Sequence, residues 1–168
     1  GLGIPAEPLF RSSYDYVLFP AYDSSLANDK LASVAGAMPL TNTSISDFEA
    51  LANTRGEGWH ITNMAAVATN QMLQIVEYGM MNSQTALEAG IVRNPNGSSV
   101  CYFITGSTSA LGNATGHATS TQVSINNTIS TQTDEGYRAI SYRGMENPWG
   151  NVWQLIGGLN VNGTNEVG

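Results

Sequence analysis

The sequence predicts a domain that combines helices and strands. A capping motif and a long amphipathic pattern predict helices within residues 47–78, and apolar or alternating runs predict strands before and after them. With 168 residues, the chain has the length of one domain with a core of its own. We divide it into an N-terminal strand and loop region, residues 1–44, and a main domain, residues 45–168. We expect the whole to be part of a longer chain.

The N-terminal region contains one predicted strand, residues 16–19, which Pro20 ends. Residues 21–44 follow as a predicted loop rich in Asp, Asn and Ser. These oxygen-bearing side chains leave a Ca²⁺ site open as a hypothesis. We favour a solvated loop, because oxygen ligands at irregular spacing are weak evidence for a metal site.

Two helices are predicted next. A capping box, Ser46–Glu49, starts a short helix over residues 47–53. Thr62 or Asn63 caps a longer helix that runs to about Tyr78. Apolar or small residues recur in it at spacings of three and four and predict one buried stripe. The stripe consists of Met64, Ala68, Met72, Ile75, Val76 and Gly79.

Glu77 is an unusual residue for its position in this second helix. It lies near the C-terminal end, where the helix dipole disfavours an acid. We therefore expect a specific hydrogen-bond partner and a buried structural role, with a catalytic role as the weaker alternative. A third, short helix begins after Asn82 or Ser83 and is closed by Gly90.

Residues 93–136 have a different composition. A strand is predicted over residues 100–104, and residues 105–121 form a long tract of Gly, Ser, Thr and Asn without periodicity. Val123 to Ile129 predicts one irregular strand. Loops as long as the 105–121 tract are uncommon unless they are functional or disordered. We therefore expect this tract to be an exposed loop that forms a recognition surface.

The stretch 139–156 concentrates aromatic and polar side chains. It predicts a strand over residues 139–143, a polar bend and a second, buried strand over residues 152–156. Gly150 lies between Trp149 and an Asn, which predicts a close backbone approach or a positive φ. We expect the indoles to belong to the core, with a ligand-site floor as the alternative.

We also expect hydrogen bonds around the bend in this stretch. Arg143 and Glu146 are predicted to bond across the turn, with Glu77 as a possible third member. These bonds would fix the loop that carries Trp149. The predicted structural motif comprises Glu77, Arg143, Glu146, Asn147, Trp149, Asn151 and Trp153.

The composition favours an extracellular or viral surface protein. Charged residues make up only 11% of the chain, against about 25% in typical soluble domains. Lys30 is the single lysine, and Asn, Ser, Thr and Gly take the place of charge. The formal net charge of −7 disfavours binding to nucleic acid. No apolar run reaches the roughly 20 residues of a membrane span, so we expect no membrane insertion.

Cysteine and histidine give little sign of a metal site. Cys101 is the single cysteine, so an internal disulfide and a Cys-based metal site are excluded. His60 and His117 are far apart and lack ligand partners at a diagnostic spacing. We therefore expect neither zinc nor another cofactor, with Ca²⁺ left as the weak exception.

Four segments together resemble the C-terminal domains of bacteriophage tail, fibre and other virion proteins. They are residues 48–59, 76–87, 107–116 and 141–153. The most specific part is Tyr-Arg-Gly-x-Glu-Asn-x-Trp-Gly-Asn-x-Trp at residues 142–153. The series is also similar to the formylglycine-generating-enzyme branch of the C-type lectin fold, and so to the variable proteins of diversity-generating retroelements. The resemblance implies an α+β fold for residues 45–168, with two helices on a twisted, mostly antiparallel sheet and long loops.

The departures from those families limit what the resemblance implies. The formylglycine enzymes need two cysteines, and this chain has one. Calcium-dependent lectins use Glu-Pro-Asn or Gln-Pro-Asp, whereas Glu146-Asn147-Pro148 has another order. Glycan hydrolysis needs paired carboxylates across a cleft, and the adjacent Asp134 and Glu135 would face opposite ways on a strand. We therefore predict no enzymatic activity and no catalytic residues.

The resemblance and the composition predict a binding module of a virion that recognises a bacterial surface glycan or protein. A structural decoration or assembly domain is the alternative, and either could bind other virion proteins or form a homo-oligomer such as a trimer. Amide side chains and aromatic faces supply the contacts that sugars need. The candidate ligand-binding residues are Asn113, His117, Asn126, Asn127, Tyr137 and Trp149.

Overall fold

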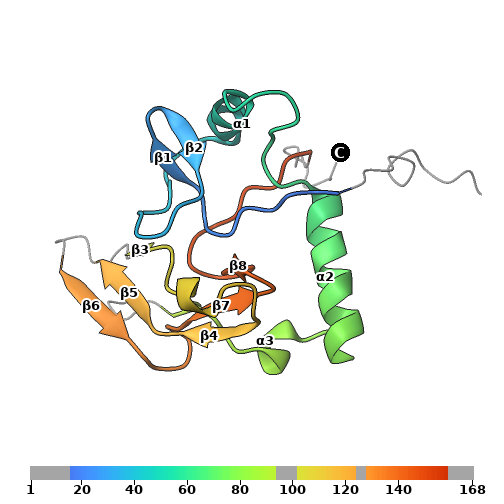
Figure 1. Cartoon of the computed structure of the whole chain (residues 1–168), viewed down its shortest axis with the longest axis vertical. Coiled ribbons are helices and arrows are strands. Elements are labelled where there is room, and N and C mark those ends of the chain that lie inside the picture. Colours follow the sequence, from blue (N-terminus) through green and yellow to red (C-terminus); the bar gives the residue numbers. More distant parts are fainter. Residues whose placement is uncertain (1–15, 94–101, 124–127, 159–168) are drawn as a thin grey trace, which may run out of the picture.

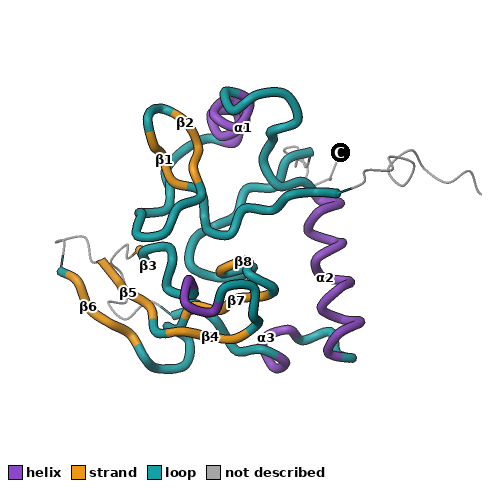
Figure 2. The backbone as a smooth tube through the Cα atoms, in the orientation of Figure 1, coloured by secondary structure: helices purple, strands orange, loops and turns teal. Residues whose placement is uncertain are grey.

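The structure, a computed structural model, describes residues 16–93, 102–123 and 128–158. It combines three α-helices with three small antiparallel sheets, so the predicted mixture of helices and strands is confirmed. Figure 1 shows the longest helix, α2, standing on one side of the molecule, with the sheets on the other. Loops make up much of the backbone between these elements (Figure 2). No helix among the described residues is long and apolar enough to cross a membrane.

The strands pair in three separate sheets. A hairpin joins β1 (Ser25–Ala27) to β2 (Lys30–Ala32). The second sheet has the order β3-β5-β6, and the third has the order β4-β7-β8. The bounds of these strands are β3 Tyr102–Phe103, β4 Gly116–Ala118, β5 Ser120–Val123, β6 Ile129–Gln132, β7 Ala139–Tyr142 and β8 Met145–Glu146.

Strand β7 forms the centre of the core. All four of its residues are buried, and β4 and β8 flank it in the sheet. Its alternate side chains therefore meet protein on both faces, as in a central strand. Ile91, Phe103 and Ala139 pack together, with Tyr137 against them. The predicted strand over residues 139–143 is thus confirmed.

Helix α1 (Ile45–Asn53) begins two residues before the predicted start. The predicted cap, Ser46, is wrong: Ser44 caps the helix, and its Oγ accepts a hydrogen bond from the Asp47 amide at 3.2 Å. The same hydroxyl donates to the Asp47 carboxylate at 2.6 Å. Ser44 and Asp47 have the three-residue spacing of a capping pair, so a second pair two residues upstream of the predicted one is used.

Helix α2 (Met64–Tyr78) has the predicted ends. The side chain of Asn63 accepts a hydrogen bond from the Ala66 amide at 2.9 Å and caps the first turn. Gly79 ends the helix in the left-handed conformation, with φ of 66°. Both signals are local in sequence, which explains why the sequence alone predicts this helix well. The short helix α3 (Ser83–Ala86) is capped by Asn82, one of the two predicted caps.

The predicted burial of the α2 stripe is wrong. Met64, Met72, Ile75 and Val76 are all exposed, and Val76 keeps 83% of its surface. Periodicity identifies the apolar face of a helix but does not supply an element that covers it. The buried residue of α2 is instead a polar one, Gln74.

Other predicted strands differ from the structure. Residues 16–19 are irregular and exposed, and residues 21–44 contain the β1–β2 hairpin. The 105–121 tract contains a 3₁₀ turn, η2 (Ser109–Leu111), and the strand β4, so it is not one open loop. The segment predicted as a strand over residues 152–156 forms no strand.

The N-terminal segment is tied to the main domain through Thr105. Its backbone amide donates to Ala37 O at 3.0 Å, and its hydroxyl donates to Val34 O at 2.7 Å. The amide of Gly36 donates to the Thr105 carbonyl at 2.8 Å. A further bond joins the Glu146 amide to Ala21 O at 2.8 Å. The described part of residues 1–44 is therefore held by specific hydrogen bonds to two other segments.

Candidate functional site

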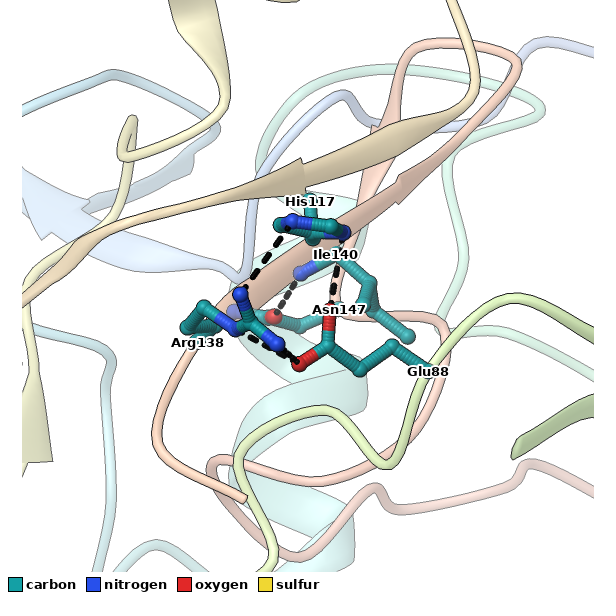
Figure 3. Close-up of polar contacts among 5 residues, drawn as sticks. All are labelled: Glu88, His117, Arg138, Ile140 and Asn147. Atoms are coloured by element: carbon teal, nitrogen blue, oxygen red, sulfur yellow. Dashed lines mark hydrogen bonds and ion pairs between the residues drawn. The ribbon is translucent and has the colours of Figure 1, made fainter. Parts of the chain in front are cut away.

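Three charged or titratable side chains from distant parts of the sequence meet beside β4 and β7 (Figure 3). Glu88 follows α3, His117 lies on β4, and Arg138 directly precedes β7. Strands β4 and β7 are paired with His117 opposite Ile140, which brings His117 close to the start of β7. We call Glu88, His117 and Arg138 the charged cluster.

Glu88 holds both other members of the charged cluster. Its Oε1 accepts a hydrogen bond from Arg138 Nε at 2.6 Å and also contacts Arg138 Nη2. Its Oε2 lies 2.8 Å from His117 Nδ1, and Arg138 Nη1 lies 3.3 Å from His117 Nε2. Nδ1 of the imidazole therefore faces the Glu88 carboxylate, and Nε2 faces the Arg138 guanidinium.

The charged cluster combines a buried anchor with exposed donors. The Glu88 side chain is only 7% exposed, whereas His117 and Arg138 are 47% and 29% exposed. The buried carboxylate has a partner on each oxygen, as a buried charge requires. It therefore fixes the orientation of an imidazole and a guanidinium that remain open to solvent.

Both ring nitrogens of His117 have partners within the charged cluster. A catalytic imidazole uses one nitrogen for an orienting carboxylate and the other for the reacting group. Here the second nitrogen, Nε2, already faces the Arg138 guanidinium.

Two of the predicted ligand-binding residues lie near this cluster. The indole of Trp149 donates from Nε1 to Ala89 O at 3.1 Å, one residue after Glu88. A Cβ on Gly90 would lie 3.0 Å from the same Nε1, so the indole lies against the Gly90 backbone. Tyr137 is adjacent to Arg138 in sequence, but it packs against the core.

Of the other predicted ligand-binding residues, His117 is a member of the charged cluster, whereas Asn113 is not. Asn113 lies beside the turn between β7 and β8, where a Cβ on Gly144 would meet its Oδ1 at 2.8 Å. Asn126 and Asn127 lie outside the described residues. Sequence reasoning missed Glu88 and Arg138. Their charge could have identified them, because charged residues are rare in this chain. A charged residue near the end of a predicted helix or strand therefore suggests a specific partner.

The predicted bond between Arg143 and Glu146 is wrong. The carboxylate of Glu146 is 3% exposed and accepts from the Gly106 amide at 2.8 Å, the Thr108 amide at 2.8 Å and the Thr108 hydroxyl at 2.7 Å. It therefore fixes the start of the 105–121 tract. Neighbouring Asn147 accepts from the Ile140 amide at 3.3 Å through its Oδ1. A sequence-local pairing was predicted, but distant backbone donors occupy the Glu146 carboxylate.

Arg143 instead bonds to Glu77, the third member of the predicted network. Its Nε donates to Glu77 Oε2 at 3.0 Å, and the Tyr142 hydroxyl donates to the same oxygen at 2.9 Å. The Tyr142 bond is the main cause that lowers the pKa of Glu77, with Arg143 adding to it. The specific partner predicted for Glu77 is confirmed, but its burial is wrong, since its side chain is 33% exposed.

Asn151 connects the Trp149 loop to two other segments. Its Nδ2 donates to Asp23 Oδ2 at 2.9 Å, and its Oδ1 accepts from the Phe103 amide at 3.3 Å. Burial raises the pKa of Asp23 to about 6, although the Asn151 bond opposes this and the Glu146 charge adds to it. Trp153, predicted as a core residue of the same motif, is 98% exposed because residues 152–156 form no buried strand.

Replacing Asp23 with Asn is expected to stabilise the fold above pH 6. The pKa of Asp23 rises from an ordinary value of 3.8 to about 6 in the folded chain, so the folded state prefers the protonated form. The ionised form is penalised by about 2–3 kcal/mol, so wild-type stability falls as the pH rises from about 4 to about 6. Asn removes that penalty.

Urea unfolding at a series of pH values measures this effect. The free-energy difference between Asp23→Asn and wild type should reach its full size above pH 6 and vanish near pH 4. A difference that stays constant across this range would show that the Asp23 charge is not its source.

Within the described ranges, no three His, Cys, Asp or Glu side chains are grouped closely enough to hold a metal ion. Comparisons of the chain with protein-family models, with curated proteins and with solved structures found no match.

Proposed function

We propose that this chain is a non-catalytic domain of a bacteriophage virion that binds a glycan or protein on the bacterial surface. The observation that carries this proposal is the charged cluster, in which buried Glu88 orients exposed His117 and Arg138. The proposed location is the virion, outside the cell, and the proposed fold is the C-type lectin-like form of the α+β class.

The charged cluster has free hydrogen-bonding capacity for a ligand. An Arg side chain carries five N–H donors, and the three contacts with Glu88 and His117 leave two for other partners. Because Glu88 already fixes the guanidinium and the imidazole, a ligand would lose less free energy to side-chain ordering. Fixed donors suit the hydroxyl groups of a sugar, and Trp149, which donates to the carbonyl of the residue after Glu88, is the candidate for contact with a C–H face.

The sequence supports the rest of the proposal. The run at residues 142–153 resembles virion proteins, and the low charge with abundant Asn, Ser and Thr is typical of extracellular surfaces. Several residues of that run hold other segments in position, among them Tyr142, Glu146 and Asn151. These contacts explain physically why the run contains these residue types, independently of any ligand.

Replacing His117 with Ala is expected to weaken binding to the bacterial surface at least tenfold. The ring is half exposed, but its loss leaves Oε2 of the buried Glu88 carboxylate without this partner, so stability should fall by about 1–3 kcal/mol and binding is compared for the folded variant. Binding is measured with a glycan array and with whole bacterial cells. His60→Ala is the matched control, because His60 is also exposed and its Nδ1 contacts the neighbouring Ile61 carbonyl at 2.8 Å.

Full binding by a folded His117→Ala variant would place the ligand elsewhere.

The alternative function, a structural domain that assembles the virion, is favoured by the exposed apolar side chains of α2. These include Met64, Met72, Leu73, Ile75 and Val76. Exposed apolar groups gathered on one element are typical of association surfaces. A folded chain that binds no surface but sediments as a trimer or other oligomer would support this alternative.

A further inference from the structure

A second candidate site lies between α2 and α3. A pocket of about 230 Å³ is lined by Gln71, Gln74 and Ile75 of α2, Met80 and Met81 of the connection, and Ser83 of α3. We propose that this pocket binds one ring of a neutral saccharide. The choice of a saccharide depends on the proposed glycan-binding function, but the pocket uses none of the side chains of the charged cluster.

Gln74 is the residue that marks the pocket as a site. It is the buried residue of α2 and only 6% exposed, yet it lies on the helix whose apolar residues face solvent. Within the described part of the chain, its amide makes no hydrogen bond. An amide that makes no hydrogen bond within the chain keeps its N–H donors and its carbonyl acceptor available for another molecule. The otherwise buried Gln74 side chain therefore offers these groups to a ligand in the pocket.

The local sequence explains how the pocket forms. Gln71 and Gln74 are three residues apart, so both amides lie on one face of α2. Gly79 then ends the helix in the left-handed conformation and redirects the chain. Met80 and Met81 follow directly, and Asn82 caps α3 so that Ser83 reaches the same pocket.

The lining defines the chemistry of the ligand. Its described side chains carry no charge, so a charged ligand would lose hydration without gaining a partner. The two amides and the Ser83 hydroxyl can each donate and accept, as sugar hydroxyl groups require. Ile75 and the two Met side chains supply apolar contact for the C–H face of a ring. The volume is below the roughly 300–1,000 Å³ of pockets for drug-sized ligands, which fits a single ring.

The test is an NMR titration of the full chain with glucose, galactose and N-acetylglucosamine, with glucuronic acid as the charged comparison. We expect a neutral sugar to shift the side-chain amide signals of Gln74. The Gln74→Met variant should bind that sugar at least tenfold more weakly. Its Tm should stay within about 2 °C of wild type, because Met has a similar volume and the substitution removes no hydrogen bond of Gln74.

Two variants separate this inference from the proposed function. Gln84→Met makes the same chemical change at an exposed position of α3, where it removes a hydrogen bond of 3.3 Å to Ala89 O, and should leave sugar binding unchanged. His117→Ala should lose cell-surface binding but keep the monosaccharide. If cell binding depends on His117 but no sugar shifts the Gln74 signals, the saccharide pocket is wrong and the proposed function still holds. Equal binding by Gln74→Met, or tighter binding of glucuronic acid, would also overturn it.

Discussion

Replacing Gly150 with Ala is expected to destabilise the fold by about 3–5 kcal/mol. Gly150 has a φ of +82°, a region that side chains rarely adopt, and a Cβ there would lie 2.5 Å from the Ile91 carbonyl oxygen. That oxygen cannot move freely, because it accepts a hydrogen bond from the Asn151 amide at 2.8 Å. The backbone strain at Gly150 and the steric overlap of the new Cβ with the Ile91 oxygen therefore both destabilise the variant.

Gly58→Ala is the matched control for this change. Gly58 has the same φ of +82°, but no atom lies within 4 Å of its added Cβ. Its expected cost is the backbone strain alone, about 1–2 kcal/mol. Urea unfolding of both variants isolates the effect of the close approach to Ile91. Equal costs at the two positions would show that the Trp149 loop can move away from Ile91.

Replacing Glu146 with Gln is expected to destabilise the fold by about 3 kcal/mol. The carboxylate accepts three hydrogen bonds from Gly106 and Thr108 and is almost fully buried. Gln keeps the shape but turns one acceptor into a donor, which would face a backbone N–H. Hydrogen bonds to a charged acceptor stabilise a fold more than bonds between neutral groups. Glu146→Gln should therefore lower the free energy of unfolding more than an ordinary surface substitution does.

Two measurements check the role of Glu146. Urea unfolding gives the change in stability, and Glu57→Gln at an exposed position should stay within about 0.5 kcal/mol of wild type. NMR titration should show a lower pKa for Asp23 in Glu146→Gln, because the Glu146 charge helps to raise it. An unchanged stability would mean that the Gly106 and Thr108 amides find other partners.

The sequence predicted best what depends on neighbouring residues. The ends of α2 follow from the Asn63 cap and the Gly79 stop, each readable within a few positions. Gly150 was expected to approach another backbone or to have a positive φ, and both are confirmed. In each case, the physical cause lies within the local chain or in the steric properties of one residue type.

Features that depend on distant contacts were predicted poorly. The partners of Glu146 lie about forty positions earlier, so the nearby Arg143 was chosen instead. The charged cluster joins Glu88 to Arg138 across fifty positions and was missed. The apolar pattern of α2 was correct as a pattern, but burial needs a covering element, which a periodicity does not specify.

The bonds of Glu146 divide the 105–121 tract into two parts with different evolutionary freedom. The start of the tract is anchored at Gly106 and Thr108, and β4 holds its later part against β7. Between these anchors, residues 112–114 are exposed. Substitutions at Asn113 and Ala114 can accumulate without loss of the fold, whereas the anchors and Gly112, which has a φ of +56°, are restricted. The tract can therefore diversify its surface across related sequences while its frame stays constant.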